Sequence, residues 1–245
     1  MEHNEYQNTM DVSIKNEAIA KQQATFISKV YMWMSLALAI TGLTAYLCAN
    51  TPALLSMMFN PVTGKATFLF YALIIGELAL VFSLSGAINR MTAGLATAVF
   101  LFYSFINGMT LSMIFLVYNM GSIATTFFIT AGTFAIMSAY GYFTKTDLTK
   151  FGRILSMALI GIILAIIVNI FLKNSMLDLI ISVVGVLVFV GLIAYDTQKV
   201  KEIGSQIGES GQEEYTKGAI MGALALYLDF INLFLFLLRF FGGRK

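Results

Sequence analysis

The stretch ALALYLDFINLFLFLLRFF, residues 223–241, is apolar enough to cross a lipid bilayer, yet it carries Asp229 near its middle. A bilayer core is about 30 Å thick and needs about 20 apolar residues for each spanning helix. The whole chain has the same character, because 58% of its 245 residues are hydrophobic, 11% are charged and its mean hydropathy is +0.82. Soluble domains do not have this composition. The sequence therefore predicts an all-α integral membrane protein.

Apolar segments of near-spanning length occur at residues 30–49, 66–88, 93–118, 121–142, 154–172, 178–198 and 218–241. They predict one seven-helix transmembrane domain over residues 30–245. Residues 1–29 form a polar tail that lacks the apolar core and the cleavage site of a signal peptide. We expect this tail to be cytosolic.

Basic residues set the orientation of a membrane protein, because loops rich in Lys and Arg stay in the cytosol. A cytosolic N-terminus places ten basic residues inside, namely Lys15, Lys21, Lys29, Arg90, Lys145, Lys150, Arg153, Lys199, Lys201 and Lys217. Only Lys65 and Lys173 then lie outside. Arg239, Arg244 and Lys245 conflict with this scheme, because a seventh full span puts them outside and a re-entrant last segment keeps them inside. We favour seven spans.

Several functional classes are excluded by residues that the chain lacks. Cys48 is the only cysteine, so no intramolecular disulfide or thiolate metal cage can form. His3 is the only histidine, so Ser-His-Asp chemistry and histidine-ligated zinc are absent from the bundle, and a pH response there must come from carboxylates. The net charge of +2 is scattered and does not indicate nucleic-acid binding. We expect no enzyme and no organic cofactor.

Asp229 shares a helical face with small residues. Gly218, Gly222, Ala225, Asp229 and Asn232 recur at steps of four, three, four and three. Small residues let a second helix approach closely in a membrane. The face therefore predicts that Asp229 points into the bundle, either as a functional group or as a protonated side chain that only bonds across helices.

Two further acids lie in apolar surroundings. Asp196 comes at the end of the sixth segment in GLIAYDTQKV, where an ordinary interfacial residue is the alternative. Glu77 lies mid-span in YALIIGELALVF, where a charge costs at least about 2.5 kcal/mol, so Glu77 is either neutral or faces partners. Asn107 in FYSFINGMTLS is more typical of helix packing, although Asn oxygens such as those of Asn107 and Asn232 can also bind a hard cation along a path.

The sequence resembles the Bax inhibitor-1 family of transmembrane proteins. The resemblance is carried by ALALYLDFINLFLFLLRFFG at the C-terminus, IAYDTQ around Asp196 and YSFINGMTLS in the third segment, and it extends over nearly all of the chain from the first segment onward. It implies a seven-helix bundle with the last helix near the centre and a pH-sensitive calcium leak. Met113 departs from the family pattern, in which many members have proline.

The resemblance also implies roles for individual residues. Asp196 and Asp229 correspond to a proton-sharing pair, and Glu77 to a glutamate on the ion path, so all three are predicted to meet calcium. The family has an arginine that latches the pair. This sequence has Ile88 or Asn89 at that position, and Arg90 is the only nearby substitute.

Physical chemistry suggests how such a pair could act as a gate. Two carboxyl groups within hydrogen-bond reach in a low-dielectric site cannot both ionise cheaply, so they hold one proton and titrate as a unit. Loss of that proton would separate the helices unless an arginine or calcium compensated. One difficulty is depth, because Asp229 lies about 17 Å along a helix that begins at residue 218, whereas Asp196 lies at a helix end. A tilt or an earlier helix start must close this gap.

Other functions remain open. The order Tyr195-Asp196 followed by an aspartate in the next helix is also that of intramembrane aspartyl proteases, but Leu226 and Leu228 replace the glycines that those enzymes place before the second aspartate. The resemblance also implies a non-catalytic membrane interactor that modulates a membrane quality-control protease or a stress pathway, with residues 1–29 as the segment to test. Short loops favour a bacterial inner membrane.

Overall fold

The computed structural model describes the backbone of residues 2–60, 63, 65–207 and 211–243, and the side chains of those ranges from residue 17 onward. In chain order the helices are α1 (Glu2–Asn50), α2 (Pro52–Met58), α3 (Phe68–Ala87), the 3-10 helix η1 (Ile88–Arg90), α4 (Ala93–Leu111), α5 (Ile114–Val117), α6 (Met120–Phe143), α7 (Thr149–Leu172), α8 (Ser175–Gln206) and α9 (Gln212–Phe241). Within the described ranges, seven of them are long and apolar enough to cross a membrane. The predicted all-α membrane fold is confirmed.

Side-chain caps fix where several of these helices begin. The Thr92 hydroxyl accepts a hydrogen bond from the backbone N–H of Leu95 at the start of α4. Asn119 does the same at the start of α6, and Asn174 accepts from two backbone N–H groups at the start of α8. Such caps satisfy N–H groups that the first helical turn leaves unpaired.

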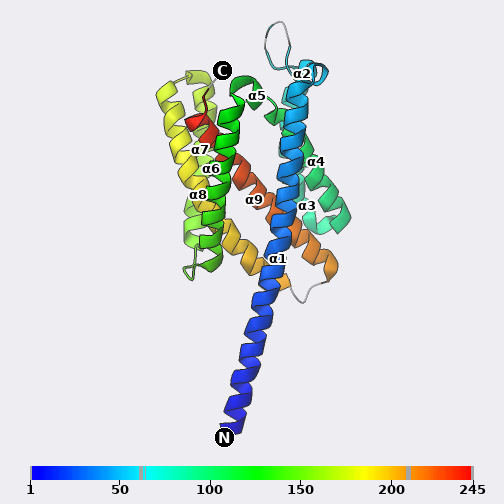
Figure 1. Ribbon diagram of the computed structural model, residues 1–245, viewed down its shortest axis with the longest axis vertical. Coiled ribbons are helices and arrows are strands. Elements are labelled where there is room, and N and C mark those ends of the chain that lie inside the picture. Colours follow the sequence, from blue (N-terminus) through cyan, green and yellow to red (C-terminus); the bar gives the residue numbers. More distant parts are fainter. Residues whose placement is uncertain (1, 61–62, 64, 208–210, 244–245) are drawn as a thin grey trace.

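α9 is the central helix of the bundle. In its most apolar stretch 67% of the residues are buried, against 39% at most in the other six long helices. It crosses obliquely behind α1, from its first turns at the lower end of the bundle to its last turn near the top of the view (Figure 1). It packs on α8, α1, α6 and α4. The central position expected for the last helix is therefore confirmed.

The outer helices expose large apolar side chains. Phe82 on α3 is 74% exposed and Phe171 on α7 is 81% exposed. Because these side chains lie on spanning helices, lipid is the medium that can cover them.

Several predicted boundaries were wrong because polar helical turns continue beyond the apolar segments. α1 does not begin near residue 30 but runs unbroken from Glu2, and Phe26 and Ile27 within the predicted tail are buried in the bundle. α8 does not end near residue 198 but continues to Gln206. The third segment is divided between α4 and α5, and Met113 lies at the break. The side chain of His3 lies outside the described residues, and the cytosolic location of residues 1–29 stays a prediction.

The last segment is one continuous helix, which fits a full span and not a re-entrant hairpin. Its residue Arg239 forms an ion pair with Asp178 on α8. Arg239 is one of the three basic residues that conflict with a seventh full span, and its charge is compensated by Asp178 inside the protein. Arg244 and Lys245, which also entered that argument, lie outside the described residues.

The packing of α8 against α9 closes the predicted gap in depth. A methyl group added to Gly218 of α9 would meet Ile207 next to the end of α8, and one added to Gly222 would meet Val200 and Val30. Asp196 precedes Ile207 by eleven residues and Asp229 follows Gly218 by eleven, so both lie about 17 Å from the same contact. The earlier start of α9, at Gln212, makes this register available.

Candidate functional site

Asp196 of α8 and Asp229 of α9 lie side by side in the interior. Their carboxyl groups are within hydrogen-bonding reach of each other. Asp229 is 4% exposed, and Asp196 is half-buried. The positive charge of Lys199 attracts the Asp196 carboxylate. The small-residue face of α9 thus turns Asp229 into the bundle, as its spacing predicted, and Asp229 meets α8 there.

The second oxygen of Asp229 has no donor. Its Oδ2 atom is buried, and no N–H or O–H group of the described residues hydrogen-bonds to it. A buried carboxylate without donors is costly, whereas a carboxyl group that shares a proton with its neighbour supplies the missing donor itself. The surroundings of Asp229 are therefore suited to a pair that holds one proton.

Arg90, the candidate latch, is not bonded to the aspartate pair in the part of the chain described. It ends η1 and its side chain is exposed. No hydrogen bond or ion pair connects it to Asp196 or Asp229 within the described ranges. The latch role stays a prediction without a contact to support it.

Glu77 lies in a second polar group, between α3 and α4. The Thr110 hydroxyl donates to its Oε1 atom at 2.7 Å, and the Asn107 amide donates to its Oε2 atom at 3.3 Å. Two residues predicted for the ion path, Glu77 and Asn107, are therefore direct partners.

This group continues into the centre of the bundle through Tyr227. The Tyr227 hydroxyl donates to Asn107 Oδ1 at 3.0 Å, and it shares a second hydrogen bond of 2.7 Å with the Thr41 hydroxyl. The Thr41 hydroxyl has one hydrogen, which it can donate to Tyr227 or to the backbone carbonyl of Ser104, 2.8 Å away. The chain of bonds joins α3, α4, α9 and α1. Its central residue is fully buried, two positions before Asp229.

The sequence reading missed Tyr227 although it stands in the opening stretch. A tyrosine buried in a bundle normally finds a partner for its hydroxyl, and this rule was a usable signal. Among the described residues, Asn232, in contrast, makes only a local bond of 2.7 Å to the Leu228 carbonyl, and it is half-buried. The structure does not join Asn232 to the Glu77 group by any hydrogen bond between described residues.

The three acids predicted to bind calcium do not form one cluster. Asp196 and Asp229 are together, whereas Glu77 belongs to the separate group around Asn107. Among the described residues no group of three or more His, Cys, Asp or Glu side chains could hold a metal ion. Any calcium path would therefore have two separate sets of oxygen atoms and no closed metal cage.

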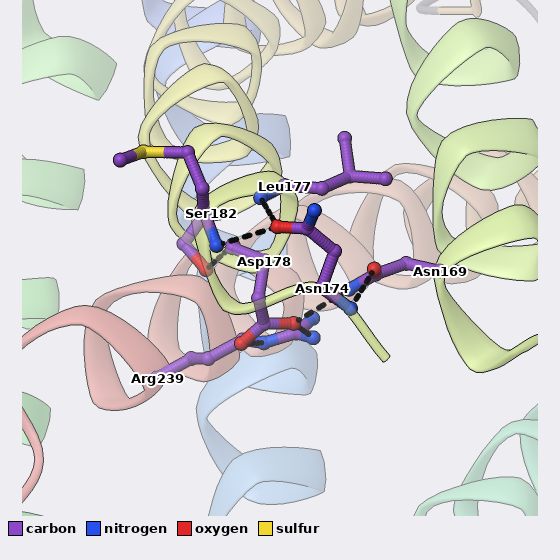
Figure 2. Close-up of polar contacts among 7 residues, drawn as sticks. Asn169, Asn174, Leu177, Asp178, Ser182 and Arg239 are labelled. Carbon is purple, nitrogen blue, oxygen red and sulfur yellow. Dashed lines mark hydrogen bonds and ion pairs between the residues drawn. The ribbon is translucent and has the colours of Figure 1, made fainter. Parts of the chain in front are cut away.

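A third polar group, which the sequence reading missed, joins the far ends of α8 and α9 (Figure 2). Asp178 in the first turn of α8 forms an ion pair with Arg239 in the last turn of α9, and the Arg239 Nε atom donates to Asp178 Oδ2 at 2.8 Å. The Asn169 amide of α7 donates to Asp178 Oδ1 at 3.3 Å, and Asn169 also accepts from the backbone of Asn174 at 3.0 Å. The last turn of α9 is thereby tied to the α7–α8 connection.

Comparison with known proteins identifies the family. The family described as "Inhibitor of apoptosis-promoting Bax1" matches residues 23–245. The chain belongs to the Bax inhibitor-1 family. It is 48% identical to the "Inner membrane protein YbhL" of Escherichia coli over 239 residues, which covers 96% of this chain and all of that protein.

Other relatives carry less informative names. An uncharacterized protein of Borreliella burgdorferi is 44% identical over 231 residues, which cover 94% of this chain and 96% of the relative. An uncharacterized membrane protein of Streptococcus pyogenes is 36% identical over 223 residues, which cover 89% and 92% of the two chains. The family match and these relatives establish that the chain is a member of the Bax inhibitor-1 family with a membrane-spanning fold.

Proposed function

We propose that this protein is a pH-sensitive calcium leak channel or transporter, gated by a proton that Asp196 and Asp229 share between α8 and α9. The observation that carries the proposal is the contact between the two carboxyl groups, together with the buried Asp229 Oδ2 atom that has no donor among the described residues. An acid pair of this kind inside a membrane protein is a functional candidate by default.

The gate works through the number of protons on the pair. With one proton present, the pair is a hydrogen bond between two helices. Without it, two like charges face each other in a poorly polarisable interior, and their repulsion favours separation of α8 from α9. Because the open state then binds fewer protons than the closed state, raising the pH favours opening.

Calcium ions are the proposed cargo. Calcium takes oxygen ligands from carboxylates, amide side chains, carbonyls and water, and it competes with the proton for the same carboxylate oxygens. The Glu77 group supplies further oxygens of this kind, from Glu77, Asn107 and Thr110. An ion that moved along α9 could therefore exchange one set of oxygens for the other.

Calcium flux into dye-loaded proteoliposomes over a series of pH values tests the proposal. We expect wild-type flux to rise with pH, and Asp196→Asn and Asp229→Asn each to remove most of that dependence. Asp147→Asn is the control, because the hydroxyl and the N–H of Thr149 donate to Asp147 and lower the pKa of its exposed carboxyl. Asp147 therefore stays ionised over the pH series of the flux assay. The proposal fails if both aspartate variants in the pair keep wild-type flux and its pH profile.

We infer a bacterial inner-membrane location with a cytosolic N-terminus. The excess of Lys and Arg on one side of the seven spans supports this orientation, and the name of the Escherichia coli relative supports the membrane. Labelling of single cysteines with a membrane-impermeant maleimide on whole cells tests it in a Cys48→Ser background. A cysteine at Lys65 should react and one at Lys150 should not.

A second candidate function, a non-catalytic interactor of a membrane quality-control protease, is favoured by the shape of α1. This helix continues well beyond the bundle at its N-terminal end (Figure 1). Deletion of residues 2–16 leaves the buried residues Phe26 and Ile27 in place. If the deletion abolishes co-purification with such a protease while calcium flux persists, the interaction is a separate function. If both are retained, this role of the helix is refuted.

A further inference from the structure

An apolar groove opens on the side of the bundle between α1 and α6. Its volume is about 720 Å³, and Phe230 of α9 lies among its lining residues. α1 and α6 each pack on α9 far more than on each other, and the groove lies between them. A hydrogen bond of 2.6 Å between the Tyr31 and Ser138 hydroxyls bridges the two helices at one level of the groove. The groove is lined by helices that are long and apolar enough to span a membrane, so lipid can reach its open side.

Small residues give the groove its width. Ala24, Ser28 and Ser35 line it on α1, and Ala131 and Ala135 line it on α6. Along α6 the lining extends from Phe127 to Phe143, sixteen residues or about 24 Å. This length is most of the about 30 Å thickness of a bilayer core. The groove therefore has the dimensions of an extended acyl chain.

One end of the groove is basic. A second depression of about 700 Å³ shares Ala24 and Ser28 with the apolar groove and is also lined by Lys21 and Lys29. Lys21 is exposed, and the Lys29 ammonium group lies 4.8 Å from the ring centre of Tyr215. The apolar groove thus leads onto an open face of α1 that carries two positive charges.

We propose that this groove binds one anionic phospholipid, with an acyl chain between α1 and α6 and its phosphate at Lys21 and Lys29. The charge complements an anionic headgroup, because basic residues at the membrane surface attract such lipids. The acyl chain buries apolar surface that would otherwise line an empty space in the hydrocarbon core.

The test uses the detergent-purified full-length protein and native mass spectrometry with added phosphatidylglycerol or phosphatidylcholine of identical chains. We expect one bound lipid per protein and a preference for phosphatidylglycerol. Ala135→Trp, which fills the groove, should abolish binding of both lipids. Ala79→Trp adds the same ring to an exposed position of α3 and should bind like wild type.

The headgroup is tested separately. Lys21→Gln and Lys29→Gln should each weaken phosphatidylglycerol binding about fivefold and leave phosphatidylcholine binding unchanged. Lys150→Gln removes an exposed charge at the start of α7 and should have no effect. Melting temperatures of all variants show whether each one is folded.

Three results would overturn the proposal. They are equal affinity for the two lipids, lipid binding by folded Ala135→Trp at the wild-type level, and displacement of the lipid by inorganic phosphate, which would indicate a pocket for a free anion. None of these measurements depends on calcium flux, so they judge the lipid site independently of the channel.

Discussion

Removal of the ion pair between Asp178 and Arg239 should loosen the last turn of α9. The two side chains retain 25% and 32% of their exposure, so the pair is neither fully buried nor at the surface. Removing one partner of a fully buried ion pair lowers the free energy of unfolding by about 3–5 kcal/mol. An exposed ion pair contributes only about 0.2–1 kcal/mol. We therefore expect Arg239→Met to lower the free energy of unfolding by about 2 kcal/mol.

A double-mutant cycle isolates the interaction. Arg239→Met leaves Asp178 with a hydrogen bond from Asn169, and Asp178→Asn leaves the guanidinium group of Arg239 without this carboxylate. The double variant removes both charges and should cost little more than either single variant. The coupling energy should be about 1–2 kcal/mol.

Unfolding by sodium dodecyl sulfate in mixed micelles, followed by helical circular dichroism, measures these free energies. The control cycle uses Lys217→Met and Glu213→Gln, whose ion pair of 3.3 Å lies within one helix and leaves Glu213 57% exposed. Its coupling should stay below about 0.5 kcal/mol. If the Asp178–Arg239 cycle gives no more coupling than this control, the proposed tie between α8 and α9 is refuted.

Three further substitutions test other parts of the bundle by the same unfolding measurement. Tyr227→Phe removes the donor to Asn107 and should cost about 1–3 kcal/mol, whereas no loss would mean that the buried chain of hydrogen bonds does not stabilise the fold. Gly141→Ala places a methyl group against the backbone of α8 and should destabilise, whereas Gly132→Ala meets open space and should not; equal effects would contradict the close approach. Asn174→Ala removes the cap of α8 and should cost about 1 kcal/mol, so an unchanged stability would argue against that cap.

The helices could be predicted from the sequence because lipid imposes a length and a composition on each span. The ends of the helices could not be predicted, because polar residues that continue a helix beyond its apolar segment do not raise the mean hydropathy. The polar residues before residue 30 belong to α1, and those from residue 199 to Gln206 belong to α8, so both helices continue beyond their apolar segments. Phe26 shows this directly, since it is buried against Gly204 and Gly218 although it lies in a polar stretch.

The side chains at the candidate site were recognisable one by one, but their partners were not. The spacing of Gly218, Gly222 and Asp229 placed the aspartate on the packed face. Which residue it met depended on the register between α8 and α9, and that register is a tertiary property. For the same reason the pairing of Asp178 with Arg239, 61 positions apart, was not visible as a motif.

The three polar groups along α9 bear on which helix would move in the proposed gate, when Asp196 and Asp229 lose the proton that they are proposed to share. α9 is held at its last turn by Arg239 and near its middle by Tyr227, whose hydroxyl connects it to α1 and α4. The Arg239 attachment lies at the C-terminal end of α9, and the Tyr227 attachment lies two residues before Asp229. Neither attachment includes Asp196 or Asp229. α8 is tied to the same fixed end through Asp178. The part of α8 beyond residue 196 is also held, because Gln198 donates to the Thr146 carbonyl at 2.9 Å and Lys201 donates to the Tyr142 carbonyl at 2.8 Å. Repulsion between Asp196 and Asp229 would therefore move the part of α9 before Tyr227 more readily than it would move α8. That part of α9 packs on Phe26 of α1 through Gly218, so the displacement would be passed to the helix that projects from the bundle.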